Sequence, residues 1–472
     1  MGQAQFGMIG LGTMGRNFLL NVAEHGFSGI GYNKHQDKLD LLLEECKGLQ
    51  LTGVDNVPDF IAGLEKPRRI MMLVPAGDAV DSVINDLLPH LDPGDVVIDG
   101  GNSHFSDTER REAFLNSKGI EFLGVGVSGG EEGARHGASI MIGGKPEVYE
   151  HVRPMLEAAS AKVNGEPCAA HVGHGSAGHF VKMVHNGIEY GLMQLIAESF
   201  DLLQRGFQIT DDKAADLFER WDKGSLNSFL IEITSTVLRK KDDDGSPLVE
   251  KILDTAGQKG TGKWTSQVAM DLGVPIPTID SAVTMRQISA RKAERVEAAE
   301  NLGIVQDMQI DETLAPDTIG FIESALHLAF ITTYAQGFSL LQTASAEKNY
   351  ELDLVEIAKI WRGGCIIRAA MLEDLRKAFE AKPNLPNILL ADTFRELIRQ
   401  EHGLLKATIK FAIAADVPCM AFSASHNYLK ACASKRLPAN LIQAQRDFFG
   451  AHSYQRIDKE GTFHTPDWAV TN

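Results

Sequence analysis

Cysteine is scarce in this chain, and its few thiols show no pairing pattern. Five cysteines, Cys46, Cys168, Cys365, Cys419 and Cys432, are scattered over 472 residues without a Cys-x-x-Cys pair. Neither a disulfide framework nor a cysteine-ligated zinc site is indicated, and unpaired thiols are typical of a reducing compartment. We therefore expect a cytoplasmic protein without a metal.

Positive charge is also limited, because 46 Lys and Arg residues face 63 Asp and Glu residues and the net charge is −17. Such a surface disfavours nucleic acids and has no general attraction for anionic membranes or substrates. No run of about 18 apolar residues could span a membrane, and the first residues lack the pattern of a signal peptide. A site for an anion must therefore gather its own Lys and Arg side chains.

The composition is otherwise that of a globular protein, with 44% hydrophobic and 23% charged residues. A chain of 472 residues exceeds the size at which a single core stops growing, so two or three domains are expected.

Over residues 1–177, short strand-like runs alternate with helical stretches. This alternation predicts a Rossmann-type α/β domain with a parallel sheet. The predicted strands are Gln5–Ile9, Gly29–Tyr32, Ile70–Val74, Val96–Asp99 and Glu121–Val127. Several of them end in Gly, Asn, Ser or Pro, where an open α/β sheet binds its ligands.

Over residues 178–435, apolar residues recur three and four positions apart, which predicts a large all-helical domain. Ser176 is the candidate N-cap of its first helix, and Gly206 is the candidate stop. Residues 436–472 form a polar C-terminal tail that is rich in aromatic side chains, so we expect it to pack on another surface.

The helical part also contains a faint internal repeat. Phe200–Gln204 and Trp221–Gly224 find similar strings about 140 residues later, at Phe338–Gln342 and Trp361–Gly364, which hints at a duplicated helical unit. Chance similarity between helix-rich segments is the alternative.

A glycine-rich string, Gly10-Leu11-Gly12-Thr13-Met14-Gly15, follows the first predicted strand and begins a helix that ends near Gly26. Gly10 permits a tight turn, Gly12 lets the backbone approach a pyrophosphate, and Gly15 allows close packing of helix on sheet. Amides at the helix N-terminus then meet the phosphates. This setting predicts a nicotinamide dinucleotide site, with a generic βα turn as the alternative.

The second predicted strand leads into Asn33-Lys34-His35. A fold that prefers NAD would carry an acidic residue here, on the ribose hydroxyls. Lys34 could instead meet a 2′-phosphate, with Asn33 and His35 as hydrogen-bonding neighbours, which favours NADP. A lysine contacts phosphate as a point charge, so NAD remains the alternative cofactor, and an ordinary surface lysine is the simpler interpretation.

Five polar residues share one face of a predicted helix: Lys182, His185, Asn186, Glu189 and Tyr190. The mixture of charged, imidazole, amide and phenol groups suits the wall of a cleft, whereas an exposed helix face is the bland alternative. Lys182 could act as a general base if its pKa fell from about 10.4 to roughly 7–8. Glu189 could act as an acid if its pKa rose, so one helix could serve two successive proton transfers.

Two loops at predicted sheet ends could face this helix, Gly100-Gly101-Asn102 and Ser128-Gly129-Gly130. Their side chains and amides would form a cradle for a carboxylate or for hydroxyls. Either loop alone is more often an ordinary turn.

Four strings, Lys182–Tyr190, Val127–Gly133, Lys259–Trp264 and Leu437–Asp447, occur in order over nearly the whole chain. Together they closely resemble the long-chain form of the 6-phosphogluconate dehydrogenase family. The resemblance implies oxidative decarboxylation of 6-phosphogluconate to ribulose 5-phosphate and CO2, with reduction of NADP. It implies that Lys182 takes the proton of the C3 hydroxyl as hydride leaves, and that Glu189 protonates the resulting enediol.

The resemblance also implies a set of binding residues and a homodimer. The substrate contacts map to Asn102, Ser128, Gly129, Gly130, His185, Asn186, Tyr190, Lys259, Thr261, Arg286, Arg446 and His452. The cofactor contacts map to Gly10, Leu11, Gly12, Thr13, Met14, Gly15, Asn33, Lys34, His35, Val74, Ala76 and Asn102. Arg446 and His452 would reach the phosphate from the tail of the partner subunit. Asn33-Lys34-His35 departs from the family's usual Asn-Arg-Thr.

Two other functions fit parts of the sequence. A β-hydroxyacid dehydrogenase acting on an unphosphorylated acid would share the glycine turn and the helix lysine, but the long second half and the phosphate contacts oppose it. A non-catalytic dinucleotide-binding protein would have no need of both Lys182 and Glu189.

Overall fold

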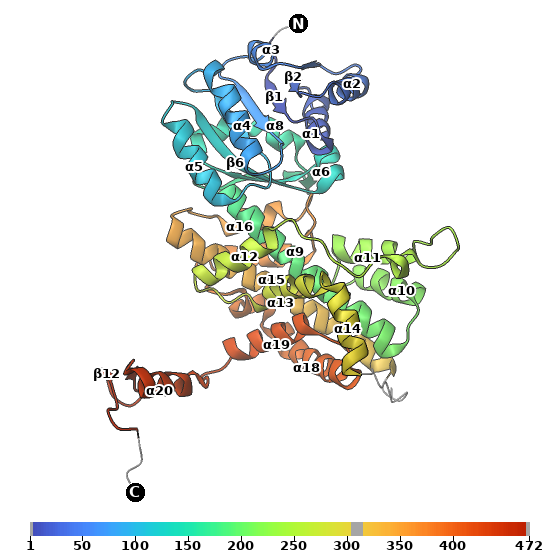
Figure 1. Cartoon of the computed structure of the whole chain (residues 1–472), viewed down its shortest axis with the longest axis vertical. Helices are drawn as coiled ribbons and strands as arrows, with labels where there is room; N and C mark the ends of the chain where they lie inside the picture. Colours follow the sequence, from blue (N-terminus) through green and yellow to red (C-terminus); the bar gives the residue numbers. More distant parts are fainter. Residues whose placement is uncertain (1–2, 304–314, 469–472) are drawn as a thin grey trace. The chain divides into compact units, whose positions relative to one another are not determined.

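The structure is a computed structural model that describes residues 3–303 and 315–468, with the side chains of the second stretch described from residue 319. The chain divides into two compact units, Met1–Ser425 and His426–Asn472. Within the larger unit, an eight-stranded sheet with its covering helices adjoins a large helical region (Figure 1). The prediction of a Rossmann-type domain followed by a large helical domain is confirmed.

The sheet has the strand order β10-β7-β6-β5-β4-β1-β2-β3. Its strands are β1 (Phe6–Ile9), β2 (Gly29–Tyr32), β3 (Leu51–Val54), β4 (Arg69–Met72), β5 (Val96–Asp99), β6 (Glu121–Ser128), β7 (Ser139–Gly143) and β10 (Ala169–Gly173). The six strands from β1 to β6 pair in parallel with their neighbours among them.

The five predicted strands are all parallel, and the sheet departs from this order only at one edge, beyond them. β7 runs antiparallel to β6, and β10 runs parallel to β7. Residues 129–138, with the short helix α6 (Gly130–His136), connect β6 to β7. A parallel neighbour needs a crossover of about a dozen residues or more, so this short connection brings the chain back in the opposite direction. A separate small hairpin follows, formed by β8 (Lys162–Val163) and β9 (Glu166–Pro167).

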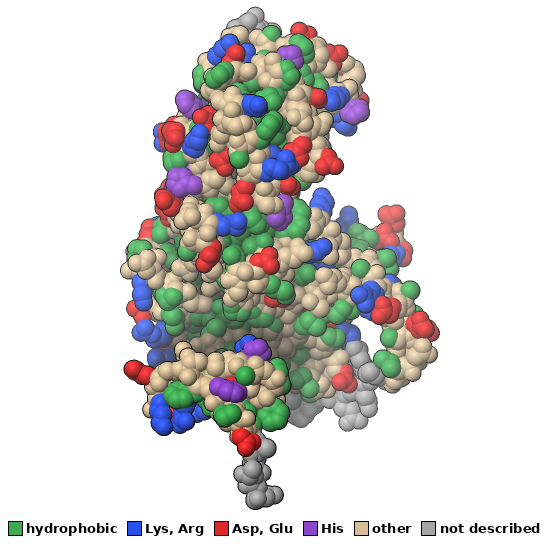
Figure 2. Space-filling model, turned by 60° about the vertical axis from the view of Figure 1, so that its left-hand side comes forward, with side chains coloured by type: hydrophobic (Ala, Val, Ile, Leu, Met, Phe, Trp, Pro, Cys, Tyr) green, Lys and Arg blue, Asp and Glu red, His purple; other side chains and the backbone are tan. Residues whose placement is uncertain are grey.

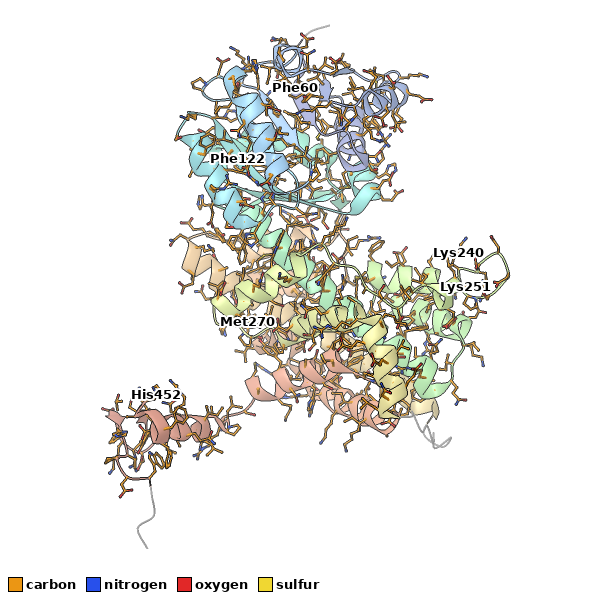
Figure 3. All side chains as sticks on the ribbon, viewed as in Figure 1. Phe60, Phe122, Lys240, Lys251, Met270 and His452 are labelled. Carbon is orange, nitrogen blue, oxygen red and sulfur yellow. The ribbon has the colours of Figure 1, made fainter. Side chains whose placement is uncertain are left out.

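Helices cover both faces of the sheet, which is why its strands are apolar on both sides. α1 (Thr13–Glu24), α2 (Gln36–Glu45), α7 (Pro146–Glu150) and α8 (Arg153–Ala159) contribute to the core on one face. α3 (Val57–Ala62), α4 (Asp78–Leu87) and α5 (Phe105–Asn116) contribute to the core on the other. Phe60 and Phe122 belong to this second core (Figure 3).

Helix α9 (Ala177–Asp201) connects the sheet with the helical region and approaches its neighbours closely through glycines. A Cβ atom on Gly178 would lie 2.2 Å from the carbonyl oxygen of Gly124 in β6. Further along, Gly187 lies against Thr265 of α12 (Thr261–Asp271), and Gly191 lies against Thr333 of α15 (Ala315–Lys348). The helix can therefore contact the sheet at one end and the helical core along the rest.

The predicted ends of α9 are correct in position. Ser176 occupies the N-cap, but its side chain makes no capping hydrogen bond. Its hydroxyl instead contacts Glu109 and the phenol of Tyr350, at 3.0 and 2.7 Å, which tie the helix start to α5 and to the loop after α15. Gly206 closes a π-helical turn over Leu202–Gly206, at the predicted stop.

The other helices of the larger unit are α10 (Asp211–Asp222), α11 (Phe229–Arg239), α13 (Pro277–Ser289), α14 (Lys292–Leu302), α16 (Leu354–Ile360), α17 (Met371–Ala381) and α18 (Asp392–Ala414), and α19 (Met420–Cys432) runs into the smaller unit. The order α9, α10, α11 returns as α15, α16, α17, in agreement with the duplicated unit. Trp221 lies in the last turn of α10 and Trp361 is the C-cap of α16, and both are fully buried. No helix within the described residues is both long and apolar enough to cross a bilayer.

The smaller unit is organised around Asp447 of α20 (Ala439–Gly450). Its buried carboxylate accepts hydrogen bonds from the amides of Ser453 and Thr465, at 2.8 and 3.0 Å, and from the indole of Trp468 at 3.0 Å. The ring of His464 lies 2.9 Å from the same carboxylate. β11 (Tyr454–Gln455) and β12 (Thr462–Phe463) pair as a short hairpin within this unit.

The close approach of α9 to the sheet predicts that Gly178→Ala destabilises the protein. The new Cβ would lie 2.2 and 2.6 Å from backbone atoms of Gly124 and Gly143, which cannot move aside like a flexible side chain. We expect a loss of about 1–3 kcal/mol and a lower melting temperature by calorimetry. Gly403→Ala is the matched control, because nothing lies within 4 Å of that Cβ position; alanine there should stabilise α18 by about 0.5–1 kcal/mol. Equal melting temperatures would contradict this account.

Candidate active site

A cavity of about 900 Å³ lies at the carboxyl-terminal edge of the sheet, beside α9, α12 and α13. Its lining residues are Val74, Pro75, Ala76, Asn102, Asn186, Glu189, Tyr190, Gly257, Gln258, Lys259, Thr261, Trp264 and Arg286. Most of these residues were predicted to act in catalysis or to bind substrate or cofactor, and they come from distant parts of the sequence to meet around one space. We call it the substrate cavity.

Lys182 lies on α9 one turn before Asn186, on the same face of the helix, and its residue surface is only 7% exposed. Gly126 of β6 makes this burial possible, because a Cβ atom there would lie 2.4 Å from Cβ of Lys182. Burial lowers the pKa of Lys182 from 10.5 to about 8, although the charge of Glu189 opposes the shift. A neutral amine is therefore accessible close to neutral pH.

Glu189 is displaced in the opposite direction. Burial raises the pKa of its carboxyl group, against the opposing charges of Lys182 and Arg286. Both groups are therefore shifted towards their uncharged forms. A base and an acid with pKa values moved towards the working pH form the pattern expected for proton transfer.

His185 connects α9 with the end of β6. Its Nε2 lies 3.3 Å from the hydroxyl of Ser128, and its Nδ1 lies 3.0 Å from the amide oxygen of Asn186. Burial and the charge of Lys182 lower the pKa of His185 well below its usual value, so the ring is neutral. Ser128 therefore meets the helix as predicted, and it does so through His185.

The two glycines after Ser128 shape the turn that follows β6. Gly129 has a φ of 118°, and a Cβ atom on it would lie 2.5 Å from the carbonyl oxygen of Gly364. Only glycine allows the loop around Gly364 to close on this turn. Gly130 begins α6, and none of Ser128, Gly129 and Gly130 is among the lining residues of the substrate cavity.

The end of the substrate cavity near α12 and α13 is suited to an anion. The guanidinium of Arg286 lies 3.5 Å from the ring centre of Tyr190 and donates a hydrogen bond to the carbonyl of Gly257 at 3.0 Å. Lys259 and Thr261 stand at the N-terminus of α12 and line the same space. Two cations, a hydroxyl and a helix N-terminus are the groups that bind phosphate in proteins.

A second cavity, of about 470 Å³, lies over the glycine turn. It is lined by Ile9, Gly10, Gly12, Tyr32, Asn33, Lys34, His35, Lys38, Leu73, Val74, Pro75, Ala79, Ser82 and Val83. We call it the cofactor cavity. Val74 and Pro75 line both cavities, so the two spaces adjoin.

The glycine turn fits a dinucleotide. A Cβ atom on Gly15 would lie 1.9 Å from the carbonyl oxygen of Gly10, and one on Gly10 would lie 2.6 Å from that of Leu73. Gly12, in contrast, has nothing within 4 Å of its Cβ position. The turn is thus closed towards the sheet and open at Gly12, where a pyrophosphate would approach the start of α1.

The predicted cofactor residues differ in which of their atoms can reach the cofactor cavity. The side chain of Leu11 is fully buried against Gly31, so only its backbone can face a ligand. Thr13 and Met14 open α1 but do not line the cofactor cavity. Lys34 lines it, and its ammonium is held 3.1 Å from the carboxylate of Asp86.

Sequence reasoning missed several residues of the two cavities. Lys38 is a second cation in the cofactor cavity, on the first turn of α2 and four residues after Lys34, and this closeness in sequence was the available signal. Gln258 and Trp264 also line the substrate cavity; Gln258 directly precedes the string that gave Lys259 and Thr261, and Trp264 is its last residue. Arg446 and His452 belong to the smaller unit, where Arg446 lies on α20 and His452 follows it.

Comparison with known families gives two matches that together span most of the chain. A model of the NAD binding domain of 6-phosphogluconate dehydrogenase matches residues 5–173. A model of the C-terminal domain of 6-phosphogluconate dehydrogenase matches residues 178–468.

Individual relatives agree over their whole length. The NADP(+)-dependent, decarboxylating 6-phosphogluconate dehydrogenase of Bacillus subtilis is 49% identical over 469 residues, covering 99% of this chain and 100% of the relative. The decarboxylating enzyme of Escherichia coli is 47% identical, with coverage of 99% and 100%. A solved structure of Plasmodium falciparum 6-phosphogluconate dehydrogenase, described as apo and in complexes with NADP+ and with 6-phosphogluconate, matches with a TM-score of 0.95 at 42% identity, covering 98% of this chain and 99% of that one. The chain therefore belongs to the 6-phosphogluconate dehydrogenase family.

Proposed function

We propose that the protein catalyses the oxidative decarboxylation of 6-phospho-D-gluconate to D-ribulose 5-phosphate and CO2, with reduction of NADP. The observation that carries this proposal is the presence on one helix of a lysine with a lowered pKa and a glutamate with a raised pKa. A simple alcohol oxidation needs only the base. A decarboxylation that leaves an enediol needs an acid as well.

NADP, when bound, accepts a hydride from C3 of the substrate. Neutral Lys182 takes the proton of the C3 hydroxyl as the hydride leaves. The resulting ammonium then polarises the 3-keto oxygen, so the bond between C2 and the carboxylate breaks and CO2 departs. Lys182 donates its proton to that oxygen, which gives the enediol, and takes it back as protonated Glu189 donates its own proton to C2, the carbon that becomes C1 of D-ribulose 5-phosphate.

The remaining residues of the site bind and orient the substrate. Asn102, His185 and Asn186 would contact its hydroxyls, and Ser128, Gly129 and Gly130 would hold its carboxylate. Tyr190, Lys259, Thr261 and Arg286 would hold its phosphate. Lys259 and Arg286 lie together in a protein of net charge −17. This supports a phosphate site there, because local cations must offset the overall repulsion of anions.

For the cofactor, we propose NADP, with Gly10 to Gly15 at the pyrophosphate and Val74, Ala76 and Asn102 towards the nicotinamide. Lys34, Asn33 and His35 would meet the 2′-phosphate, and Lys38 adds a second positive charge there. The carboxylate of Asp86 competes for Lys34, since the two form an ion pair. NAD is therefore the alternative cofactor, and it should react more slowly.

The alternative of a β-hydroxyacid dehydrogenase acting on an unphosphorylated acid is less well supported. Such a substrate has no group for Lys259 and Arg286 to neutralise. A non-catalytic dinucleotide-binding protein would gain nothing from burying Lys182, because burial of an ammonium destabilises the folded state.

We further propose a cytoplasmic homodimer with three parts in each subunit: 1–177, 178–435 and a tail, 436–472, that inserts into the partner. Large apolar side chains of the tail are exposed: Leu441, Ile442, Phe448, Phe449 and Ile457. The larger unit also exposes apolar side chains (Figure 2), among them Ile252, Leu253 and Met270, the last labelled in Figure 3. The free cysteines support a reducing compartment.

The substrate assignment predicts that the protein forms NADPH and CO2 in equal amounts from 6-phosphogluconate. Gluconate should react with kcat/KM lower by about a thousandfold, since two or three charge-assisted contacts of about 1.5–3 kcal/mol each are lost. NADH formation should be slower than NADPH formation. Equal rates with phosphorylated and unphosphorylated gluconate would refute the substrate, and NADPH without CO2 would refute the decarboxylation.

The burial of Lys182 predicts that Lys182→Met abolishes turnover and yet stabilises the folded protein at pH 7. Because folding lowers the pKa of Lys182 from 10.5 to about 8, the unfolded chain binds more protons between these values, and wild-type stability rises with pH across this window. Below it, the buried ammonium costs about 3 kcal/mol.

The melting temperature of Lys182→Met should therefore exceed that of the wild type at pH 7, and the difference should shrink towards pH 10. Lys263→Met, at an exposed position of α12, controls for the loss of a lysine. Retained turnover, or a stabilisation that does not change with pH, would exclude the assigned role.

Tail exchange predicts that subunits with different defects complement each other. Arg446→Ala should raise the KM for 6-phosphogluconate by about 10–100-fold, as expected for the loss of a charge-assisted pair, whereas Arg456→Ala, at an exposed position of the tail, should not. In a hybrid of Arg446→Ala and Lys182→Ala subunits, one site would combine an intact Lys182 with an intact tail. Such hybrids should recover the wild-type KM at about half the activity. No recovery would mean that Arg446 does not act in the partner.

A further inference from the structure

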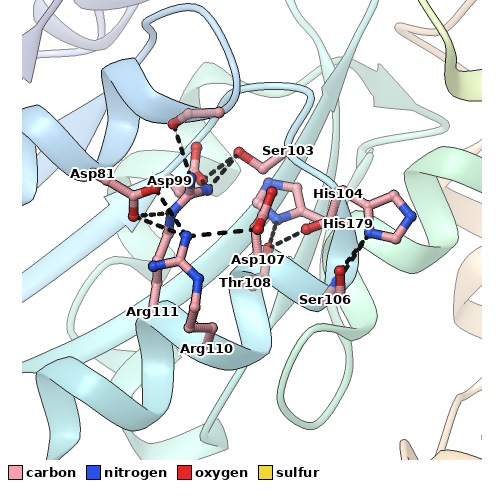
Figure 4. A network of polar contacts seen from close by, with 11 residues as sticks. Asp81, Asp99, Ser103, His104, Ser106, Asp107, Thr108, Arg110, Arg111 and His179 are labelled. Carbon is pink, nitrogen blue, oxygen red and sulfur yellow. Dashed lines mark hydrogen bonds and ion pairs between the residues drawn. The ribbon is translucent and has the colours of Figure 1, made fainter.

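A buried polar network joins the loops that line the two cavities, and Arg111 of α5 is its centre (Figure 4). Arg111 is 1% exposed. Its Nη2 donates to the carbonyl of Gly77 at 2.9 Å, and Nε and Nη2 donate to the two carboxylate oxygens of Asp81 at 2.9 and 3.0 Å. Its Nη1 donates to the hydroxyl of Ser103 at 3.2 Å and to Asp99 at 3.4 Å.

Two of these partners lie on separate loops, whereas Asp81 lies on α4 and Asp99 ends β5. Gly77 follows Val74 and Ala76 in the loop after β4, and Ser103 follows Asn102 in the loop after β5. Both loops line the substrate cavity, and the first also lines the cofactor cavity. A single guanidinium therefore links the two loops between which the nicotinamide and the substrate would meet.

The second loop is also held from within. Asp99, the last residue of β5, accepts a hydrogen bond from the hydroxyl of Ser103 at 2.6 Å and from the amide of Gly101 at 3.0 Å. Its contact with Arg111 brings this loop under the same restraint as the loop after β4. Asn102 therefore lies between Gly101 and Ser103, and hydrogen bonds to Asp99 fix the positions of both.

Helix α5 also contacts the helix that carries Lys182. The hydroxyl of Thr108 lies 2.6 Å from Nδ1 of His179, and His179 stands one turn before Lys182 on α9. Arg111 is one turn after Thr108 on the same side of α5 (Figure 4). Side chains of α5 therefore contact both cavity loops and the helix that carries Lys182.

The chemistry of the guanidinium suits this role. Its planar fork of donors reaches four residues in fixed directions, which an ammonium cannot do. Arg111 also holds the pKa of Asp81 at about 2, so the pair stays charged. Buried ion pairs add little net stability, but they specify geometry when every donor and acceptor is satisfied.

We propose that Arg111 is a positioning residue of the hydride-transfer step, which fixes the loops of Val74–Gly77 and Gly101–Ser103 relative to Lys182 and so sets the approach of nicotinamide to substrate. Arg111 lines neither cavity, so it acts through these loops. The inference rests on the proposed function.

The same sheet offers a matched control at its opposite edge. Arg68, just before β4, is 8% exposed and donates hydrogen bonds to Asp95 at 2.6 Å and to Asp92 at 2.9 Å. Neither partner lines the substrate cavity or the cofactor cavity. Loss of Arg68 therefore removes a buried Arg68–Asp95 pair, together with a half-exposed contact to Asp92, without touching the loops of the site.

The test compares Arg111→Met, Arg111→Lys and Arg68→Met in melting temperature, NADP affinity by calorimetry, kcat and the deuterium isotope effect with substrate labelled at C3. Arg111→Met should lower kcat by about 100-fold, as expected for a displacement of roughly 1 Å. It should also weaken NADP binding by about tenfold and increase the isotope effect on kcat, because hydride transfer becomes the slow step. Arg68→Met should lower the melting temperature to a similar extent and leave kcat within about twofold.

Arg111→Lys should recover melting temperature without recovering kcat, because it restores the charge and not the fork. Ser103→Ala removes the two hydrogen bonds of its hydroxyl, with Arg111 and with Asp99, and keeps every charge. It therefore serves if Arg111→Met does not fold, and it should lower kcat by about tenfold.

The inference is overturned if Arg111→Met loses no more kcat than Arg68→Met, if Arg111→Lys has wild-type kcat, or if Ser103→Ala is unchanged. Failure of the proposed function is a different result, in which the wild type itself forms no CO2 from 6-phosphogluconate. The comparison of NADP affinity between the Arg111 and Arg68 variants does not depend on that result.

Discussion

The chemistry of this protein depends on how closely α9 approaches the edge of the sheet. Gly178 of the helix and Gly126 of the sheet leave no room for a Cβ atom between the two elements. This contact removes Lys182 from water, and burial is the main cause of its lowered pKa. The acid–base pair is therefore a product of packing: a wider spacing would admit water and return both groups towards their ordinary charged states.

The site combines elements that the chain supplies far apart. One edge of the sheet presents the ends of β1, β2, β4, β5 and β6, as open α/β sheets do. The helical region adds what the sheet cannot, namely the cations on α12 and α13 and the long face of α9. The two cavities share Val74 and Pro75, so the cofactor and substrate regions meet where the loop after β4 crosses between them.

The sequence reveals the parts of this arrangement that are periodic or local. β-branched and apolar runs marked five strands, and helical spacing placed Lys182, Asn186 and Glu189 on one face, where the structure also has them. Strand β10 was missed because it is rich in Ala and Gly, which are poor strand formers. Strands β3 and β7 were missed although they are no shorter than the predicted strands. No local pattern shows that β7 reverses, that His185 contacts Ser128, or that Arg111 links two loops, because these contacts depend on tertiary packing.

The smaller unit shows how a buried carboxylate can give a tail a defined shape. Asp447 satisfies its carboxylate with donors from the segment Ser453–Trp468, and the apolar side chains of α20, including Phe448 and Phe449, remain outside. In the proposed dimer, such a segment would reach its partner already shaped. An unstructured arm loses conformational entropy when it binds, and a tail that is already shaped would lose less. More of the free energy gained from apolar contacts would then remain as affinity between the subunits.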